Sequence, residues 1–209
     1  MSSGGPAGAP LAGGSPAAAF DLVVLAASAG GLNALSAVLG PLPADLPAAL
    51  LVVQHLDPRH RSLLDDILRR RTKLTVRLAA EGDPIEPGMV LIAPPDHHLL
   101  VNPDGTVSLS QSALVHFVRP SADLLFESAA GSYRERVIAV ILTGSGSDGS
   151  MGVNAVKEKG GTVIAQDETS SQFFSMPGAA IQTGAVDFVL PLEEIGPAVV
   201  ELVTGGRVL

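Results

Sequence analysis

The chain has 209 residues and no cysteine, and its formal net charge at pH 7 is −8. A chain of this length suits one domain with its own core. The lack of cysteine excludes disulfides and thiolate chemistry, and the negative charge argues against binding of a nucleic-acid backbone as the main task. Apolar residues make up 46% of the chain but aromatic residues only 3%, so we expect an aliphatic core.

The N-terminal segment, residues 1–19, is rich in glycine, alanine, proline and serine. This composition is typical of flexible tails, so we expect the folded domain to span residues 20–205. The segment lacks the charged start and continuous apolar core of a signal peptide. No apolar run reaches the roughly 20 residues that a membrane-spanning helix needs. We therefore expect a cytoplasmic protein that is not integral to a membrane.

Apolar runs that suit buried strands alternate along the chain with stretches that suit helices. Short runs that are apolar on both faces are typical of parallel strands covered on both sides. The alternation predicts a doubly wound α/β domain with a mostly parallel sheet and helices on both faces. The predicted strands are 21–26, 49–54, 137–142, 161–166 and 185–190, and the predicted helices are 30–39, 60–71, 121–133, 149–159 and 192–203.

One stretch departs from this alternation. Residues 97–111, HHLLVNPDGTVSLSQ, place a Pro-Asp-Gly turn between two short apolar runs. That pattern predicts a small antiparallel β-hairpin. Further on, Ser121 follows Pro120 and has the residue type of a helix N-cap.

Polar residues follow three of the predicted strands at their carboxyl ends, where open parallel sheets carry their functional groups. Ser28 follows the first strand, His55 follows the second, and Asp148 lies in the loop after the run 137–142. Serine, imidazole and carboxylate at one edge could form a catalytic triad. The serine would attack an acyl carbon, the histidine would carry its proton, and the carboxylate would orient the histidine.

The residues after Ser28 are small. Ala29, Gly30 and Gly31 leave the hydroxyl accessible and place N–H groups at a helix N-terminus, where an oxyanion could bind. Each triad candidate also has an ordinary explanation, as a helix cap, a loop histidine or a turn aspartate. The segment 144–152, GSGSDGSMG, also suggests a phosphate loop, but it lacks the Walker lysine, and AASAGG does not match GxGxxG.

Six motifs in chain order resemble the catalytic domain of the CheB-type protein-glutamate methylesterases. They are AASAGG, VVQHL, EPGMVLIAPPDHHLLV, RPSADLLFESAA, AVILTGSGSDGSMG and AQDETSSQFFSMPGAAI, and the resemblance extends over about residues 21–203. It implies that Ser28 is the nucleophile, His55 the general base and acid, and Asp148 the orienting carboxylate. It also implies a doubly wound parallel sheet with a small hairpin.

The resemblance further implies the reaction and its partner. The reaction would be hydrolysis of glutamate γ-methyl esters with release of methanol, and deamidation of glutamine is allowed as well. The substrate would be the cytoplasmic helices of a methylated chemoreceptor or a related signalling receptor, and no cofactor or metal is implied. We expect Ala29, Gly30, Gly31 and Ser145 to shape the oxyanion region. The candidates for substrate contact are Arg59, His97, His98, Arg119 and Met176.

Two positions depart from the family pattern. The family often has threonine where this chain has Ala29, and methionine where it has Ser145. Both changes leave the triad residues in place but affect the expected rate and oxyanion geometry. The alternative hypothesis is therefore a catalytically weakened module that only binds its receptor. No receiver domain precedes the matching region in this sequence, so we expect activity without a phosphodonor.

Overall fold

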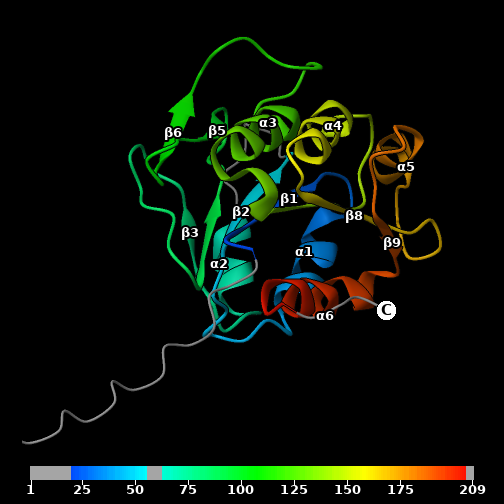
Figure 1. Ribbon diagram of the computed structural model, residues 1–209, viewed down its shortest axis with the longest axis horizontal. Coiled ribbons are helices and arrows are strands. Elements are labelled where there is room, and N and C mark those ends of the chain that lie inside the picture. The colour runs from blue at the N-terminus through cyan, green and yellow to red at the C-terminus, as the bar shows by residue number, and fades with distance from the viewer. Residues whose placement is uncertain (1–19, 56–62, 206–209) are drawn as a thin grey trace, which may run out of the picture.

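The computed structural model describes residues 20–55 and 63–205, so the segment 1–19 and Arg59 lie outside the described residues. Seven strands form one parallel sheet and two more form a separate antiparallel sheet (Figure 1). The strands are β1 (Leu22–Ala27), β2 (Ala49–Gln54), β3 (Thr75–Leu78), β4 (Met89–Ile92), β5 (His98–Val101), β6 (Val107–Ser110), β7 (Val137–Ile141), β8 (Thr162–Gln166) and β9 (Phe188–Leu190). The order in the large sheet is β3-β4-β2-β1-β7-β8-β9, with β5 paired to β6 in the small one. The predicted fold class is confirmed.

Helices cover both faces of the large sheet. They are α1 (Gly31–Leu39), α2 (Leu64–Arg69), α3 (Ala122–Tyr133), α4 (Ser150–Glu158), α5 (Ser175–Gln182) and α6 (Leu192–Val203), with a 3₁₀ turn at Arg134–Arg136. Successive side chains of β1 enter opposite cores because strand side chains alternate between faces. Leu22 and Val24 pack with α3, α4, α5 and the β5–β6 hairpin. Val23 and Leu25 pack with α1, α2 and α6.

The five predicted strands all exist, whereas two strands and one helix were not predicted. β3 has only four residues and is partly exposed, so its apolar pattern is weak. β4 has the four-residue sequence MVLI and is largely buried. So short an apolar run, next to glycine and proline residues typical of loops, is not recognisable as a strand from its pattern. α5 contains Pro177 and Gly178 in its SMPGAAIQ sequence, and both residues have poor intrinsic helix propensity.

The strand order reverses beside β1, and this reversal determines where a site can form. β1 pairs with β2 on one side and with β7 on the other, all parallel. Their carboxyl ends therefore lie at one edge. This is the topological switch point at which open α/β sheets bind their ligands. Ser28, His55 and the loop 142–148 are the segments that follow these three strands.

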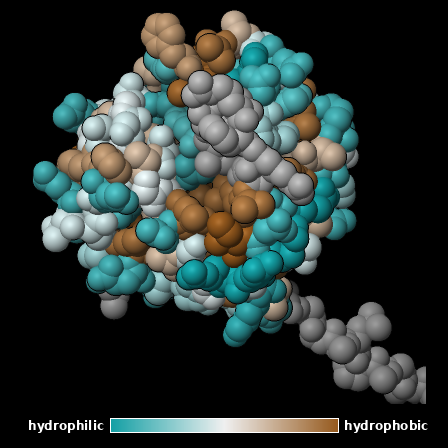
Figure 2. All heavy atoms as spheres, turned by 180° about the vertical axis from the view of Figure 1, so that it is seen from behind, coloured by the Kyte–Doolittle hydropathy of each residue, from teal (hydrophilic) through white to brown (hydrophobic). Residues whose placement is uncertain are grey.

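The surface is largely hydrophilic on the face seen in Figure 2. Hydrophobic residues gather there in a compact group near the middle of the view. Across the ranges 20–55 and 63–205, no helix is both long and apolar enough to cross a membrane.

Candidate active site

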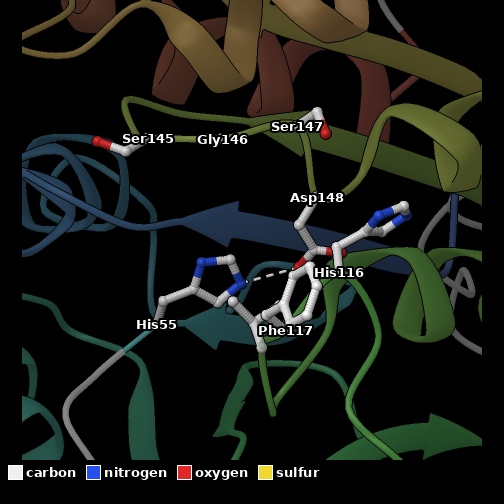
Figure 3. A pocket seen from close by; sticks show the side chains of 8 residues that line it. His55, His116, Phe117, Ser145, Gly146, Ser147 and Asp148 are labelled. Carbon is white, nitrogen blue, oxygen red and sulfur yellow. Dashed lines mark hydrogen bonds and ion pairs between the residues drawn. The ribbon is translucent and has the colours of Figure 1, made fainter.

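A histidine and a carboxylate meet at the switch point. His55 Nε2 lies 2.8 Å from Asp148 Oδ2 (Figure 3). The His55 side chain is 13% exposed and the Asp148 side chain 3% exposed. The pair is thus open to solvent only on the histidine side, as a proton carrier that serves an incoming substrate requires.

The Asp148 carboxylate sits against the N-terminus of α3. It accepts the backbone N–H of Ala122 at 2.6 Å and of Asp123 at 3.2 Å, and the Ser121 hydroxyl at 2.8 Å. Burial acts to raise the pKa of Asp148, but the hydrogen bonds from His55, Ala122 and Ser121 outweigh burial and lower it below its ordinary value. Asp148 is therefore ionised at neutral pH.

An ionised carboxylate can only accept hydrogen bonds, and this fixes the tautomer of His55. Because Asp148 accepts from Nε2, that nitrogen carries the proton. The Nδ1 atom of His55 keeps its lone pair and is the basic nitrogen of the neutral ring.

Ser121 occupies the predicted N-cap position of α3, but its side chain makes no capping hydrogen bond. Its hydroxyl donates to Asp148 instead. The Asp148 carboxylate, which is far away in the sequence, thus takes over the acceptor role that an N-cap side chain normally has. Sequence analysis missed this link because a local pattern cannot show which acceptor reaches a helix end.

Ser28 lies beside His55 by strand register. Ala27 of β1 pairs with Gln54 of β2, so the next positions on the two chains are Ser28 and His55. His55 N–H donates to Ala27 O at 3.1 Å, and Ser28 N–H donates to Thr143 O at 3.0 Å. The structure shows no hydrogen bond between Ser28 Oγ and the His55 ring, both within the described residues; in unliganded enzymes this contact is often long.

Gln54 joins the serine and histidine segments. Its side chain is buried, and its Nε2 donates to Ser28 O at 2.8 Å and to His55 O at 3.0 Å. One side-chain amide therefore fixes the main chain of both residues. Sequence analysis placed Gln54 beside His55 at the end of the second strand but assigned it no role.

Two glycines allow close packing around Ser28. A Cβ atom on Gly31 would lie 1.9 Å from Gln54 Oε1, and one on Gly144 would lie 2.8 Å from Ser28 Cβ. A Cβ on Gly144 would also meet the sulfur of Met176 at 2.2 Å. Met176, which was predicted to contact the substrate, is 1% exposed and packs behind Gly144.

The backbone donors after Ser28 differ in availability. Gly31 N–H donates to Ser28 O at 2.9 Å, so it is not available to an oxyanion, contrary to expectation. Gly30 has a φ of 79°, in the left-handed region that glycine tolerates. Within the described part of the chain, the N–H groups of Ala29 and Gly30 have no acceptor. Ser145 is exposed and directly follows Gly144, which packs against Ser28.

The remaining substrate-contact candidates have structural roles. His98 is fully buried: Ser121 N–H donates to its Nδ1 at 3.1 Å, and its Nε2 donates to Ala113 O at 3.2 Å. Burial lowers the pKa of His98, which keeps the ring neutral. It therefore joins the hairpin to the start of α3 and cannot reach a substrate. His97 Nδ1 lies 2.9 Å from Pro95 O.

Arg119 is likewise committed to protein partners. Its Nε and Nη2 donate to Asp96 Oδ1 at 2.9 and 2.6 Å, and its Nη1 donates to the carbonyls of Gln111 and Ser112. The guanidinium thus fastens the base of the segment 111–120. Sequence analysis predicted that Arg119 contacts the substrate. The local sequence around a loop arginine does not show which groups it will bind in the folded protein.

A cavity of about 300 Å³ opens beside the His55–Asp148 pair. The residues that line it come from the ends of β2 and β7 and from the segment 115–118. They are His55, His116, Phe117, Val118, Ser145, Gly146, Ser147 and Asp148. Ser28 does not line this cavity. Among the described residues, no cluster of three or more histidines and carboxylates could hold a metal ion.

These features define an α/β protein with a histidine–carboxylate pair and a serine at the switch point of its sheet. A family model described as CheB methylesterase matches residues 23–199. The chain therefore belongs to the CheB methylesterase family.

Individual relatives agree with this assignment. A protein from Moorella thermoacetica named protein-glutamate methylesterase/protein-glutamine glutaminase is 43% identical to this chain. A protein from Anaeromyxobacter dehalogenans named protein-glutamate methylesterase/protein-glutamine glutaminase 2 is 46% identical. Each match covers 89% of this chain but 45% and 54% of the relatives, so the chain spans about half their length. A relative from Leptospira interrogans is 39% identical, with 88% of this chain and 95% of the relative covered.

A solved structure is also similar. The CheB methylesterase catalytic domain of Thermotoga maritima superposes with a TM-score of 0.85 at 40% sequence identity. The match covers 88% of this chain and 99% of that domain. The likeness thus extends over essentially a complete catalytic domain.

Proposed function

We propose that this chain hydrolyses γ-methyl esters of glutamate side chains in a protein and releases methanol. The observation that carries the proposal is the 2.8 Å contact between His55 Nε2 and Asp148 Oδ2 at the switch point. Ser28 is next to His55 there, because each residue directly follows the paired positions Ala27 and Gln54. The names of the relatives support the same reaction. In this reaction Ser28 is the nucleophile, His55 the general base and acid, and Asp148 the orienting carboxylate.

In the first half of the reaction, Ser28 Oγ attacks the ester carbonyl carbon while its proton moves to Nδ1 of His55. The tetrahedral intermediate places a negative charge on the former carbonyl oxygen. The N–H groups of Ala29 and Gly30 donate hydrogen bonds to this oxyanion and stabilise its charge. The carbon–oxygen bond to the methoxy group then breaks, and the leaving oxygen takes the proton from His55 and departs as methanol.

In the second half, a water molecule attacks the glutamyl-serine ester and gives its proton to His55. The bond to Ser28 Oγ breaks, and His55 returns the proton to the serine. The products are the carboxylate of the glutamate side chain, still part of the substrate protein, and the original enzyme. Asp148 stabilises the imidazolium in both halves through its contact with Nε2.

Glutamine could enter the same site, with ammonia as the leaving group in place of methanol. The relatives' names include this second activity. The substrate we propose is a methylated segment on the cytoplasmic helices of a signalling receptor, which would place the reaction in the cytoplasm. The chemistry uses the ester, water and protein side chains and needs no cofactor.

Methanol release from a methylated receptor fragment tests this function directly. We expect turnover by the wild-type chain and none by Ser28→Ala. Labelling by a serine-directed sulfonyl fluoride should require Ser28. A wild-type chain that binds the fragment but releases no methanol would instead support the alternative of a weakened binding module. That alternative is based on Ala29 and Ser145, the two positions that depart from the family pattern.

A further inference from the structure

A two-residue turn presents an aromatic side chain at the cavity beside His55. Val115 N–H donates to Val118 O at 3.2 Å and Val118 N–H donates to Val115 O at 2.9 Å, which closes the turn. Phe117 lies at its tip and lines the same cavity as His55 (Figure 3). It is 94% exposed, whereas the other exposed large apolar residues of the described ranges are at most 58% exposed.

The turn is held in an unfavourable backbone conformation. His116 and Phe117 have φ values of 48° and 65°, in the left-handed region that residues with a Cβ rarely adopt. Such strain persists where the surrounding structure enforces it, and it is concentrated at functional sites. An exposed phenylalanine in a strained turn gains nothing for folding, so its position calls for another explanation.

A histidine–carboxylate contact ties this turn to the body of the protein. His116 Nε2 lies 3.3 Å from Asp123 Oδ2, an atom that is otherwise without a hydrogen bond in the described structure. Asp123 is itself fixed, because its Oδ1 accepts the N–H groups of Met151 and Gly152. Arg119 fastens the base of the same segment. The turn that carries Phe117 is thus anchored through His116 and at the base of its segment.

We propose that Phe117 is a specificity-determining residue that packs against an apolar side chain next to the esterified glutamate of the substrate. On a helical substrate, residues three or four positions from the glutamate lie on the same face, about 5–6 Å away. An ester that reaches His55 would therefore bring such a neighbour to the Phe117 ring, which lines the same cavity. The inference rests on the proposed esterase function and specifies the substrate class for that site.

Two helical peptides test this contact. Each carries one glutamate γ-methyl ester, with leucine at the positions three and four residues away in one peptide and glutamine there in the other. We expect the wild-type chain to favour the leucine peptide about tenfold in kcat/KM, which corresponds to partial burial of a phenylalanine ring. Phe117→Ala should remove this preference through KM, and Phe117→Leu should retain part of it.

Two further variants separate the contact from general damage. Leu114 is 54% exposed in the same segment and does not line the cavity, so Leu114→Ala should keep the wild-type preference. Asparagine tolerates the left-handed region. Phe117→Asn should therefore lose the preference while its melting temperature stays equal to or above that of the wild type. Hydrolysis of p-nitrophenyl acetate by Leu114→Ala should equal that of the wild type, since Leu114 lies outside the cavity.

The outcomes distinguish this inference from the proposed function. Hydrolysis of both peptides with equal kcat/KM, or a preference that survives in Phe117→Ala, would overturn the role of Phe117 and leave the esterase function standing. Failure of the wild-type chain on both peptides and on the small ester would overturn the esterase function. In that case the Phe117 contact is tested by binding, with the same two peptides carrying a fluorescent label and anisotropy as the readout. Tighter binding of the leucine peptide that is lost in Phe117→Ala supports the contact. Equal binding of the two peptides contradicts it.

Discussion

Asp123 and Asp148 hold the ends of each other's helices. Asp123, in the first turn of α3, donates its backbone N–H to Oδ1 of Asp148 at 3.2 Å. Its own carboxylate accepts the N–H groups of Met151 and Gly152, in the first turn of the helix that follows Asp148. Two buried carboxylates thus satisfy the N-termini of α3 and α4 in a reciprocal arrangement.

The two carboxylates should affect stability with opposite dependence on pH. Hydrogen bonds hold the pKa of Asp148 below its ordinary value, so the folded state binds fewer protons there than the unfolded state. Its contribution to stability is present above the ordinary aspartate pKa of about 3.9 and is lost as the pH falls below it. In urea unfolding between pH 3 and 7, Asp148→Asn should therefore lose stability relative to the wild type as the pH rises.

Asp123 provides the contrasting case. Burial raises its pKa, and the nearby Asp148 charge adds to the effect. Its favourable contribution is therefore present below about pH 3.9 and is lost as the pH rises through the raised pKa. Asp123→Asn should gain stability relative to the wild type over the same series. Slopes of the same sign for both variants would refute the assigned charge states.

The triad should behave as one unit in turnover. Ser28→Ala removes the nucleophile, and His55→Gln leaves the serine hydroxyl without its base, so each should abolish covalent turnover almost completely. Asp148→Asn keeps the shape but favours the wrong tautomer; the equivalent change in serine proteases costs about 10⁴-fold.

The double variant tests whether these losses are additive. Ser28→Ala with His55→Gln should cost little beyond Ser28→Ala alone. Methanol release measures turnover, and a thermal melt shows that each variant is folded. A folded Ser28→Ala variant with wild-type turnover would remove Ser28 from the mechanism.

Gln54 should matter for both stability and turnover. Gln54→Leu keeps the approximate volume but removes the donor to the Ser28 and His55 carbonyls. The Ser28 carbonyl keeps its bond from Gly31 N–H, but the His55 carbonyl loses the Gln54 donor, and a lost hydrogen bond of this kind costs about 1 kcal/mol. The serine and histidine segments also lose their common support. We expect a lower kcat with little change in KM. Gln182→Leu, at an exposed glutamine of α5, is the control and should leave both constants unchanged.

A pair of glycine variants tests the close packing beside Ser28. Gly31→Ala places a Cβ 1.9 Å from Gln54 Oε1 and 2.8 Å from Ala27 Cβ, and such overpacking costs about 1–3 kcal/mol. Gly131 in α3 has nothing within 4 Å of the same added atom. Gly131→Ala should therefore stabilise the protein by up to about 1 kcal/mol, because alanine favours a helix. Equal effects in chemical unfolding would show that the packing at Gly31 is loose.

The sequence by itself determined the fold class and the edge at which the site lies. Alternating apolar runs and helical stretches specify a parallel sheet, because each strand must be apolar on both faces when helices cover both sides. The serine, histidine and aspartate follow strands whose carboxyl ends must share an edge. These features depend on local patterns and on general rules of topology, so they could be predicted without the structure.

Only the tertiary structure decided what the other polar side chains do. Arg119, His98 and Met176 were predicted to contact a substrate. In the structure Arg119 holds the segment 111–120, and His98 joins the hairpin to α3. Met176 packs behind Gly144. The exposed Phe117 and the bridge made by Gln54 were not predicted. The partners of such groups come from segments far away in the chain. Which donor meets which acceptor, and which side is left open, depends on how the layers pack rather than on any local pattern.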